Sequence, residues 1–145
     1  MIEISLEYFD ISLRLLIAAI LGGIIGFERE KHGKDAGFRT HALVCVGSCL
    51  MMIISWKIHL LFRASGPVDP SRIAAQVVTG IGFLGAGAII RFPKGVKGLT
   101  TAAGVWAAAG IGLACGLGEY FPAVVTTVIT LIILVVFPRI SHPSS

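Results

Sequence analysis

Long apolar runs alternate with short polar segments along the whole chain. A helix needs about 17–25 mostly apolar residues to cross a bilayer. The runs that approach or reach this length cover residues 11–27, 42–62, 73–90, 98–118 and 121–137. Every proline lies outside these runs or at their edges, where it does not break a helix. The pattern predicts an all-α membrane protein in which residues 11–138 form a bundle of about five transmembrane helices.

The composition agrees with a membrane protein and argues against two other classes. Of the 145 residues, 55% are hydrophobic and 14% are charged, whereas soluble domains carry about 25% charged residues. The mean hydropathy is +0.89. The net charge of +4 comes from basic residues in short connections, not from a basic stripe with interleaved aromatics. We therefore expect contact with the lipid bilayer and no binding of nucleic acid.

The basic residues predict the orientation in the membrane. Most of them lie in the connections at residues 28–41 and 91–97, namely Arg29, Lys31, Lys34, Arg39, Arg91, Lys94 and Lys97. Connections rich in Lys and Arg stay in the cytoplasm. We expect the tail at residues 139–145 to be cytoplasmic and the short acidic N-terminus, residues 1–10, to lie outside. The connection after the second run also carries basic residues, against this rule. The N-terminus lacks the basic start of a signal peptide, so the first helix should be retained.

Small residues recur every four positions on several of the predicted helices. Such stripes let helix backbones approach closely in a bilayer. The residues that we assign to helix packing are Gly22, Gly26, Gly80, Gly82, Gly85, Gly87, Gly104, Ala108, Gly112 and Gly116. Contacts within one bundle and contacts between copies would both use such stripes, and the sequence leaves both open.

The letters GIGFLG from Gly80 to Gly85 match the spacing of a dinucleotide-binding loop. That site needs a preceding strand and an acidic residue about 20 positions further on. Here the surrounding run is apolar, and the next acidic residue is Glu119. We therefore expect no cofactor, and we interpret the glycines as close helix packing or as a locally unwound segment that lines a cavity.

Polar side chains near or within the runs are the candidates for function. The first basic connection contributes Glu28, Arg29, Arg39 and Thr40. It is either a solvated loop or a segment folded back on the helix ends, where Arg39 could pair with Glu28 or hold a lipid or partner phosphate. Gln76, Thr79, Thr100, Thr101 and Trp106 lie within the runs. A buried Gln bridges helices more often than it binds a substrate.

Charged and metal-ligating residues are scarce inside the runs. His41, Cys45 and Cys49 share one helix face but cannot all reach one ion, so we interpret them as packing residues. Asp10 and Arg14, one turn apart, are expected to neutralise each other. No Asp or Glu occupies the middle of a run, which disfavours a dedicated Mg²⁺ site. Carbonyls of an unwound Gly-rich helix remain an alternative. We expect no resident metal, no catalytic residue and no enzyme.

Four blocks resemble the MgtC/SapB family of bacterial membrane proteins. They read GFERE, AGFRTHALVCVGS, AQVVTGIGFLGAGAII and GLTTAAGVWAAAGIGLACG, and the resemblance covers residues 13–137. It implies a multi-pass bacterial inner-membrane protein linked to growth in scarce magnesium and to survival inside macrophages, and so to virulence. It also implies that the protein acts on another membrane protein, and the F-type ATP synthase is one such partner. Longer members carry a soluble C-terminal domain, so we expect the short form here.

The resemblance gives functional weight to particular residues of this chain. They are Glu28, Arg29, Ala36, Gly37, Arg39, Thr40, Gln76, Gly80, Gly82, Gly85, Gly87, Gly98, Thr100, Thr101 and Trp106.

Three hypotheses of function follow. The leading one is a non-enzymatic modulator that binds another membrane protein, or itself, through its Gly/Ala faces. The alternative is a transporter or channel for Mg²⁺, another cation or a small solute, lined by Gln76, Thr79, Thr100 and Thr101. The third is an enzyme or lipid-handling protein that uses Glu28 and Arg39.

Overall fold

The computed structural model describes residues 2–93 and 95–141. Its elements are α1 (Ile2–Lys31), α2 (Phe38–Phe62), α3 (Ser71–Gly87), β1 (Ile90–Phe92), β2 (Gly95–Lys97), α4 (Leu99–Leu117) and α5 (Tyr120–Ser141). Most of the described residues are helical, and the β1–β2 hairpin contributes the only strands among them. The prediction of an all-α membrane bundle is confirmed.

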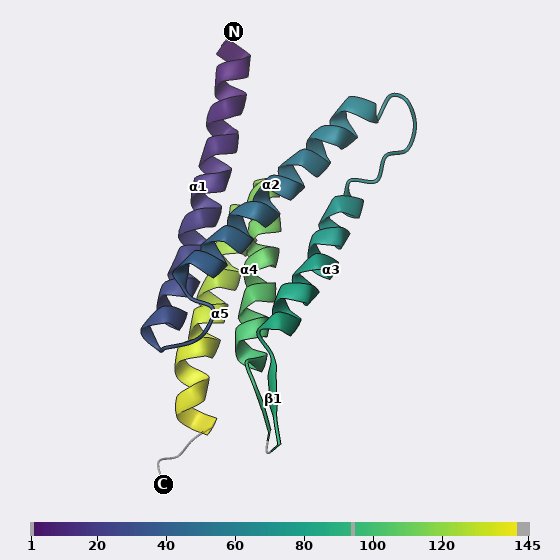
Figure 1. Cartoon of the computed structure of the whole chain (residues 1–145). Helices are drawn as coiled ribbons and strands as arrows, with labels where there is room; N and C mark the ends of the chain where they lie inside the picture. The colour runs from purple at the N-terminus through teal and green to yellow at the C-terminus, as the bar shows by residue number, and fades with distance from the viewer. Residues whose placement is uncertain (1, 94, 142–145) are drawn as a thin grey trace.

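The helices run alternately up and down (Figure 1). By length and composition, Leu6–Lys31, Phe38–Phe62 and Leu99–Leu117 can each cross a membrane, and the apolar stretch Tyr120–Val136 is shorter. The α1–α2 connection, the hairpin and the end of α5 lie at one end of the bundle. The start of α1 and the α2–α3 loop lie at the other. The two basic connections therefore share an end, while the side of the membrane that this end faces stays a prediction.

α2 lies between α1 and α4 and packs closely against both. On the α1 side, a Cβ added at Gly22 would come within 2.6 Å of the carbonyl oxygen of His41. On the α4 side, a Cβ added at Gly116 would come within 2.6 Å of the carbonyl oxygen of Cys49. Real Cβ atoms essentially never approach so closely, so only glycine fits at these crossings. The stripes on α1 and α4 thus hold one bundle together.

The residues of α2 that were interpreted as a packing face fill this seam. Cys45 and Cys49 are fully buried free thiols. The Sγ of Cys45 donates a hydrogen bond to the carbonyl oxygen of Ala108, at 3.1 Å. Both cysteines belong to the larger of the hydrophobic clusters of the core. The interpretation as packing residues is confirmed for Cys45 and Cys49.

The third apolar run ends earlier than expected. The sequence predicted a span to Ile90, but α3 ends at Gly87 and Ile90 begins a strand. In the hairpin, Ile90 pairs with Lys97 and Phe92 with Gly95. Two further features explain the difference: the end of α3 is rich in glycine, which weakens a helix, and Gly98 has φ +89°. A side chain at Gly98 would meet the carbonyl of Ala88, so this glycine lets the chain turn back into α4.

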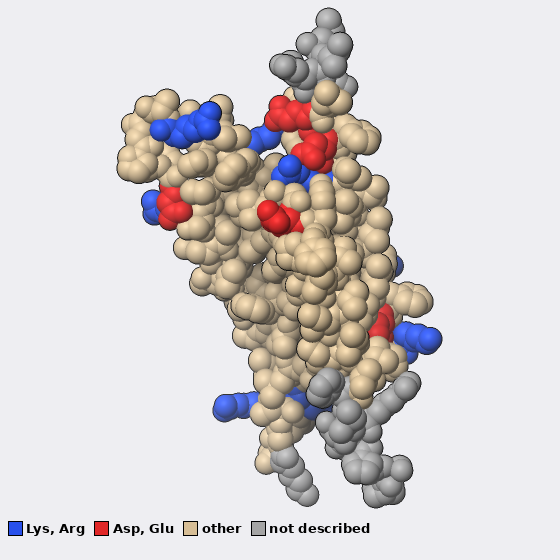
Figure 2. Space-filling model, turned by 180° about the vertical axis from the view of Figure 1, so that it is seen from behind, with Lys and Arg blue, Asp and Glu red and all other residues tan. Residues whose placement is uncertain are grey.

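The surface suits a lipid environment. Large apolar side chains are exposed on each of the helices. On the face drawn in Figure 2, most charged side chains gather toward the two ends, and a broad uncharged band lies between them. Because lipid-facing residues need no burial within the protein, these exposed side chains are expected of a membrane bundle.

Candidate functional site

Buried polar side chains gather where α1 ends and α2 begins. Glu28 and Arg29 lie near the end of α1, and His41 lies near the start of α2. The connection folds back tightly because Gly33 adopts φ +62°. The carboxylate of Glu30 accepts a hydrogen bond from the backbone N–H of Phe38, at 2.9 Å. This contact satisfies a free N–H at the start of α2 and fixes the two helices at their junction.

Arg29 is the charged residue that this junction buries. It is only 4% exposed. Its Nη1 lies 3.7 Å from Oε2 of Glu28, whose side chain is 11% exposed. The other carboxylate oxygen of Glu28 lies 3.0 Å from Nδ1 of the exposed His32. The guanidinium is therefore compensated by one nearby carboxylate, at a distance too long for a hydrogen bond.

The imidazole of His41 is fully buried and lies within range of the charges of Arg29 and Glu28. Its Nδ1 lies 3.0 Å from the carbonyl oxygen of Gly37. A carbonyl can only accept a hydrogen bond, so Nδ1 carries the proton in the neutral ring and Nε2 is left as an acceptor. A Cβ added at Gly104 would lie 3.3 Å from Nε2. Glycine at this position of α4 therefore makes the room that the ring occupies.

Glu28, Arg29 and His41 together form what we call the buried polar cluster. Oε2 of Glu28, Nε of Arg29 and Nε2 of His41 are buried and have no hydrogen-bond partner among the described residues. An unsatisfied buried polar atom costs about 1–3 kcal/mol. The cluster thus contains one cationic donor and two acceptors whose hydrogen-bonding capacity is unused among the described residues. Among the described residues, no group of three or more His, Cys, Asp or Glu is arranged to hold a metal ion.

A second polar arrangement lies at the opposite end of the bundle. Nε of Arg14 donates to Oδ2 of Asp10 at 2.8 Å, which confirms the predicted pair. Nη1 of Arg14 also donates to the carbonyl oxygen of Gly116 at 2.7 Å. This carbonyl belongs to the last turn of α4, where carbonyls lack helical partners and the helix dipole favours a cation. Arg14 therefore ties α1 to the end of α4.

The structure separates the polar residues that the sequence grouped as candidates. Arg29 and Thr101 are buried, and Glu28 is largely covered. The others are exposed on the outside of the bundle, namely Arg39, Thr40, Gln76, Thr79, Thr100 and Trp106. Arg39 does not fold back to pair with Glu28, because Arg29 takes that place. His41, which the sequence assigned to packing alone, joins the buried polar cluster.

The assigned packing residues also separate into two groups. Gly22, Gly26, Gly104, Ala108, Gly112 and Gly116 are buried in the seams of α2 with α1 and α4, and Gly85 packs against Ala102. Gly80, Gly82 and Gly87 have no atom within 4 Å of an added Cβ. These three glycines do not serve packing within the described chain. Nor is α3 unwound there, because it is a continuous helix from Ser71 to Gly87.

The buried role of His41 carried little signal in the sequence. Its regular spacing with Cys45 and Cys49 describes a helix face, but it does not reveal that Gly104 leaves space for the ring. The burial of Arg29 did carry a signal. Arg29 follows the buried positions Ala18, Gly22 and Ile25 at helical spacing, so it lies on the buried face of α1.

Comparison with known proteins gives consistent results. The sequence profile of the MgtC family matches residues 15–142. YhiD of Escherichia coli strain K12, whose name proposes a magnesium transporter, is 47% identical over 131 residues, which cover 89% of this chain and 61% of YhiD. Protein MgtC of Salmonella typhimurium strain LT2 is 46% identical over 123 residues, which cover 85% of this chain and 50% of MgtC.

A third relative has no assigned activity. It is an uncharacterized protein of Haemophilus influenzae, 41% identical over 140 residues, which cover 94% of this chain and 59% of the relative. The chain therefore spans about half to three-fifths of the length of these relatives. No solved structure gives a significant match.

Proposed function

Because the chain belongs to the MgtC family, we propose that it is a non-enzymatic modulator of another membrane protein, active when magnesium is scarce or during intracellular survival. The link to magnesium comes from the family, and the name of its member YhiD also refers to magnesium. The modulating role rests on a surface of α3 that this bundle does not use. The same role was first assigned to the Gly/Ala faces, but those on α1 and α4 are occupied inside the bundle.

α3 is the helix with the most open outer face. Its buried residues are Ile81 and Gly85, on the side that meets α4. Gln76, Thr79 and Phe83 are three or four residues apart and so share the opposite side. Phe83 is 83% exposed. We call Gln76, Thr79, Gly80 and Phe83 the outer face of α3.

The observation that carries the proposal is the amide of Gln76. It is exposed on this face, and it makes no hydrogen bond within the described residues. Thr79, by contrast, satisfies its hydroxyl with the carbonyl oxygen of Ala75, at 3.0 Å. In hydrocarbon an amide without a partner is costly, and interhelical hydrogen bonds are its usual solution. Gly80 beside it would allow the backbone of a second helix to approach closely.

The partner class is a transmembrane helix of another protein. The family resemblance suggests the F-type ATP synthase, and self-association through the same face is the other arrangement. The binding chemistry is the same for both: an apolar helix that presents a hydrogen-bonding group to Gln76 and a surface that fits Phe83.

Co-purification from native membranes tests the proposal. The wild type is compared with Gln76→Leu and Phe83→Ala, and with Ile129→Ala as a matched control on the exposed surface of α5. We expect a stoichiometric partner with the wild type and the control, and its loss with both α3 variants. Retention of the same partner by folded Gln76→Leu and Phe83→Ala proteins would place the interface elsewhere. Recovery of the protein alone in every case would remove the proposal.

The transport alternative is supported by the name given to YhiD. Within one copy of this chain, the four residues first proposed to line a path do not converge. Thr101 is buried in the bundle, whereas Gln76, Thr79 and Thr100 point outward. A path would therefore have to form between copies. Measurement of Mg²⁺ flux into liposomes that contain the purified protein separates the two functions, since a modulator without its partner gives no flux.

A further inference from the structure

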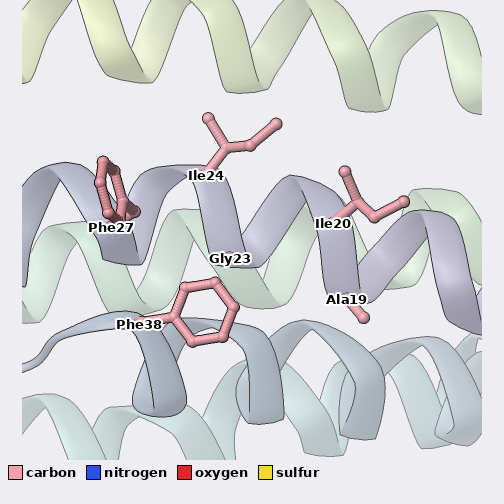
Figure 3. Close-up of a pocket in the computed structure, with 6 residues that line it drawn as sticks. All are labelled: Ala19, Ile20, Gly23, Ile24, Phe27 and Phe38. Carbon is pink, nitrogen blue, oxygen red and sulfur yellow. The ribbon is translucent and has the colours of Figure 1, made fainter.

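An apolar pocket opens on the side of the bundle where α1 meets the start of α2. Its volume is about 430 Å³, and its lining consists of Ala19, Ile20, Gly23, Ile24, Phe27 and Phe38. In Figure 3, Phe27, Ile24 and Ile20 follow one another along α1, and the ring of Phe38 reaches across from α2. A Cβ added at Gly23 would lie 2.7 Å from Cε2 of Phe38, so glycine allows this ring to form the wall.

The pocket lies inside the stretch of α1 that can cross the membrane, Leu6–Lys31. Its lining presents apolar side chains and no charged group. In a bilayer such a hollow lies against hydrocarbon, so its natural occupant is an alkyl chain. Phe27 is 65% exposed and Phe38 47% exposed at the mouth, as interfacial aromatic side chains often are.

The mouth of the pocket carries a positive charge. Ile20, Ile24, Phe27 and Lys31 are spaced four, three and four residues apart, so they share one face of α1. Lys31 therefore stands one turn beyond Phe27, at the end of the helix. Its side chain is exposed, and among the described residues no carboxylate lies within 4.0 Å of its ammonium.

The distance from this charge to the bottom of the pocket matches one leaflet. Ile20 and Lys31 are separated by about 16 Å along the axis, at about 1.5 Å per residue. Half of a hydrocarbon core is about 15 Å thick. A lipid with its phosphate beside Lys31 would thus have its acyl chain alongside the pocket over most of its length.

Two of the three acidic residues near the mouth, Glu28 and Glu30, are already engaged, and the third, Asp35, is exposed. The carboxylate of Glu30 accepts the backbone N–H of Phe38, and that of Glu28 faces Arg29 and His32. Lys34 and Arg39 in the same connection are exposed. Residues 28–41 hold four basic and three acidic side chains. The free charge at the mouth is therefore positive and complements a lipid phosphate.

We propose that this pocket is a binding site for one anionic phospholipid of the leaflet at the α1–α2 junction. The acyl chain lies along Ile20, Ile24 and Phe27 against the ring of Phe38, and the headgroup phosphate pairs with Lys31. The site does not involve the outer face of α3. A test of lipid binding is therefore independent of the test of the proposed partner.

Native mass spectrometry of the full chain in detergent tests the site. The protein is incubated with phosphatidylglycerol or with phosphatidylethanolamine of the same acyl composition. We expect one retained phosphatidylglycerol and a preference over phosphatidylethanolamine. Lys31→Ala should lower that preference about fivefold, the value of one basic residue at a membrane surface. Ile24→Trp should lower the retention of both lipids, because the larger side chain fills the pocket from an exposed position.

Two matched variants control for general effects. Arg63→Ala removes an exposed cation at the opposite end, and Ile132→Trp adds the same bulk on the exposed surface of α5. Both should behave like the wild type. Equal retention of the two lipids by the wild type would overturn the proposal, as would unchanged retention in Lys31→Ala and Ile24→Trp. Equal losses in the control variants, or a polypeptide bound at the site in place of lipid, would also overturn it.

Discussion

The backbone carbonyl oxygen of Cys45 lies where a side chain at Gly112 would begin. No rotamer change can relieve this contact, because the obstacle is main chain. The α2–α4 crossing therefore depends on the missing side chain. A bulky residue at Gly112 tests the fold and not a partner surface, which changes the meaning of a variant that the small-residue stripe alone would suggest.

Gly112→Ala is expected to lower the free energy of unfolding by about 1–3 kcal/mol, the usual cost of overpacking. Gly110 on the same helix provides the control, because an added Cβ there meets nothing within 4 Å. Gly110→Ala should be neutral or stabilise by up to about 1 kcal/mol, since alanine favours a helix. Thermal unfolding followed by circular dichroism in detergent compares them. Equal stability of the two variants would contradict the crossing described for α2 and α4.

Arg29→Ala should destabilise the bundle, whereas Arg39→Ala should not. Removal of the buried guanidinium leaves the largely covered carboxylate of Glu28 without its cation. The expected loss in the free energy of unfolding is about 1–3 kcal/mol or more. Arg39 is exposed, so its loss should change this free energy by no more than about 0.5 kcal/mol. Chemical unfolding of both variants in the same detergent measures the two free energies of unfolding. A larger loss in Arg39→Ala than in Arg29→Ala would show that Arg39 is the enclosed residue.

Arg14→Met should loosen the contact between α1 and the end of α4. The variant loses two charge-assisted hydrogen bonds, to Asp10 and to the carbonyl of Gly116. One such bond contributes about 1.5–3 kcal/mol. We expect faster amide hydrogen exchange in the last turn of α4, with the rest of that helix less affected. Arg63→Met, at the same end but exposed, is the control. Unchanged exchange in Arg14→Met would mean that the carbonyl of Gly116 does not depend on Arg14.

Asp69, in the loop before α3, should titrate at unusually low pH. Hydrogen bonds from the hydroxyl and the backbone N–H of Ser71 hold the pKa of this carboxyl below its usual range. Because the folded pKa lies below the unfolded one, its contribution to stability is present above the unfolded pKa. That contribution is lost as the pH falls through the folded pKa. Ser71→Ala should raise the pKa of Asp69, as read from an NMR titration, and Ser65→Ala should not. An equal pKa in both variants would refute the hydroxyl contact.

The sequence was sufficient for features that depend on spacing along one helix. The apolar runs located the helices, and the spacing of Asp10 and Arg14 identified their ion pair. Features that depend on how two elements meet were not accessible. The segment after Ile89 was expected to continue a span and then a loop, but cross-strand pairing, which no helical spacing encodes, makes it a hairpin. The burial of His41 likewise depends on the space that Gly104 of α4 leaves for its ring.

The position of α2 between two glycine-lined neighbours has a consequence for biosynthesis. Cys45 and Ala108, which meet in the finished seam, are 63 positions apart in the chain. While α4 is still in the ribosome, α2 can pack against α1 and α3, but the side that α4 will cover still lacks its partner. The newly inserted α3 must leave that side free until α4 arrives. Completion of the fold therefore awaits a late, long-range docking step, and a pause in translation before residue 99 would leave a half-assembled protein in the membrane.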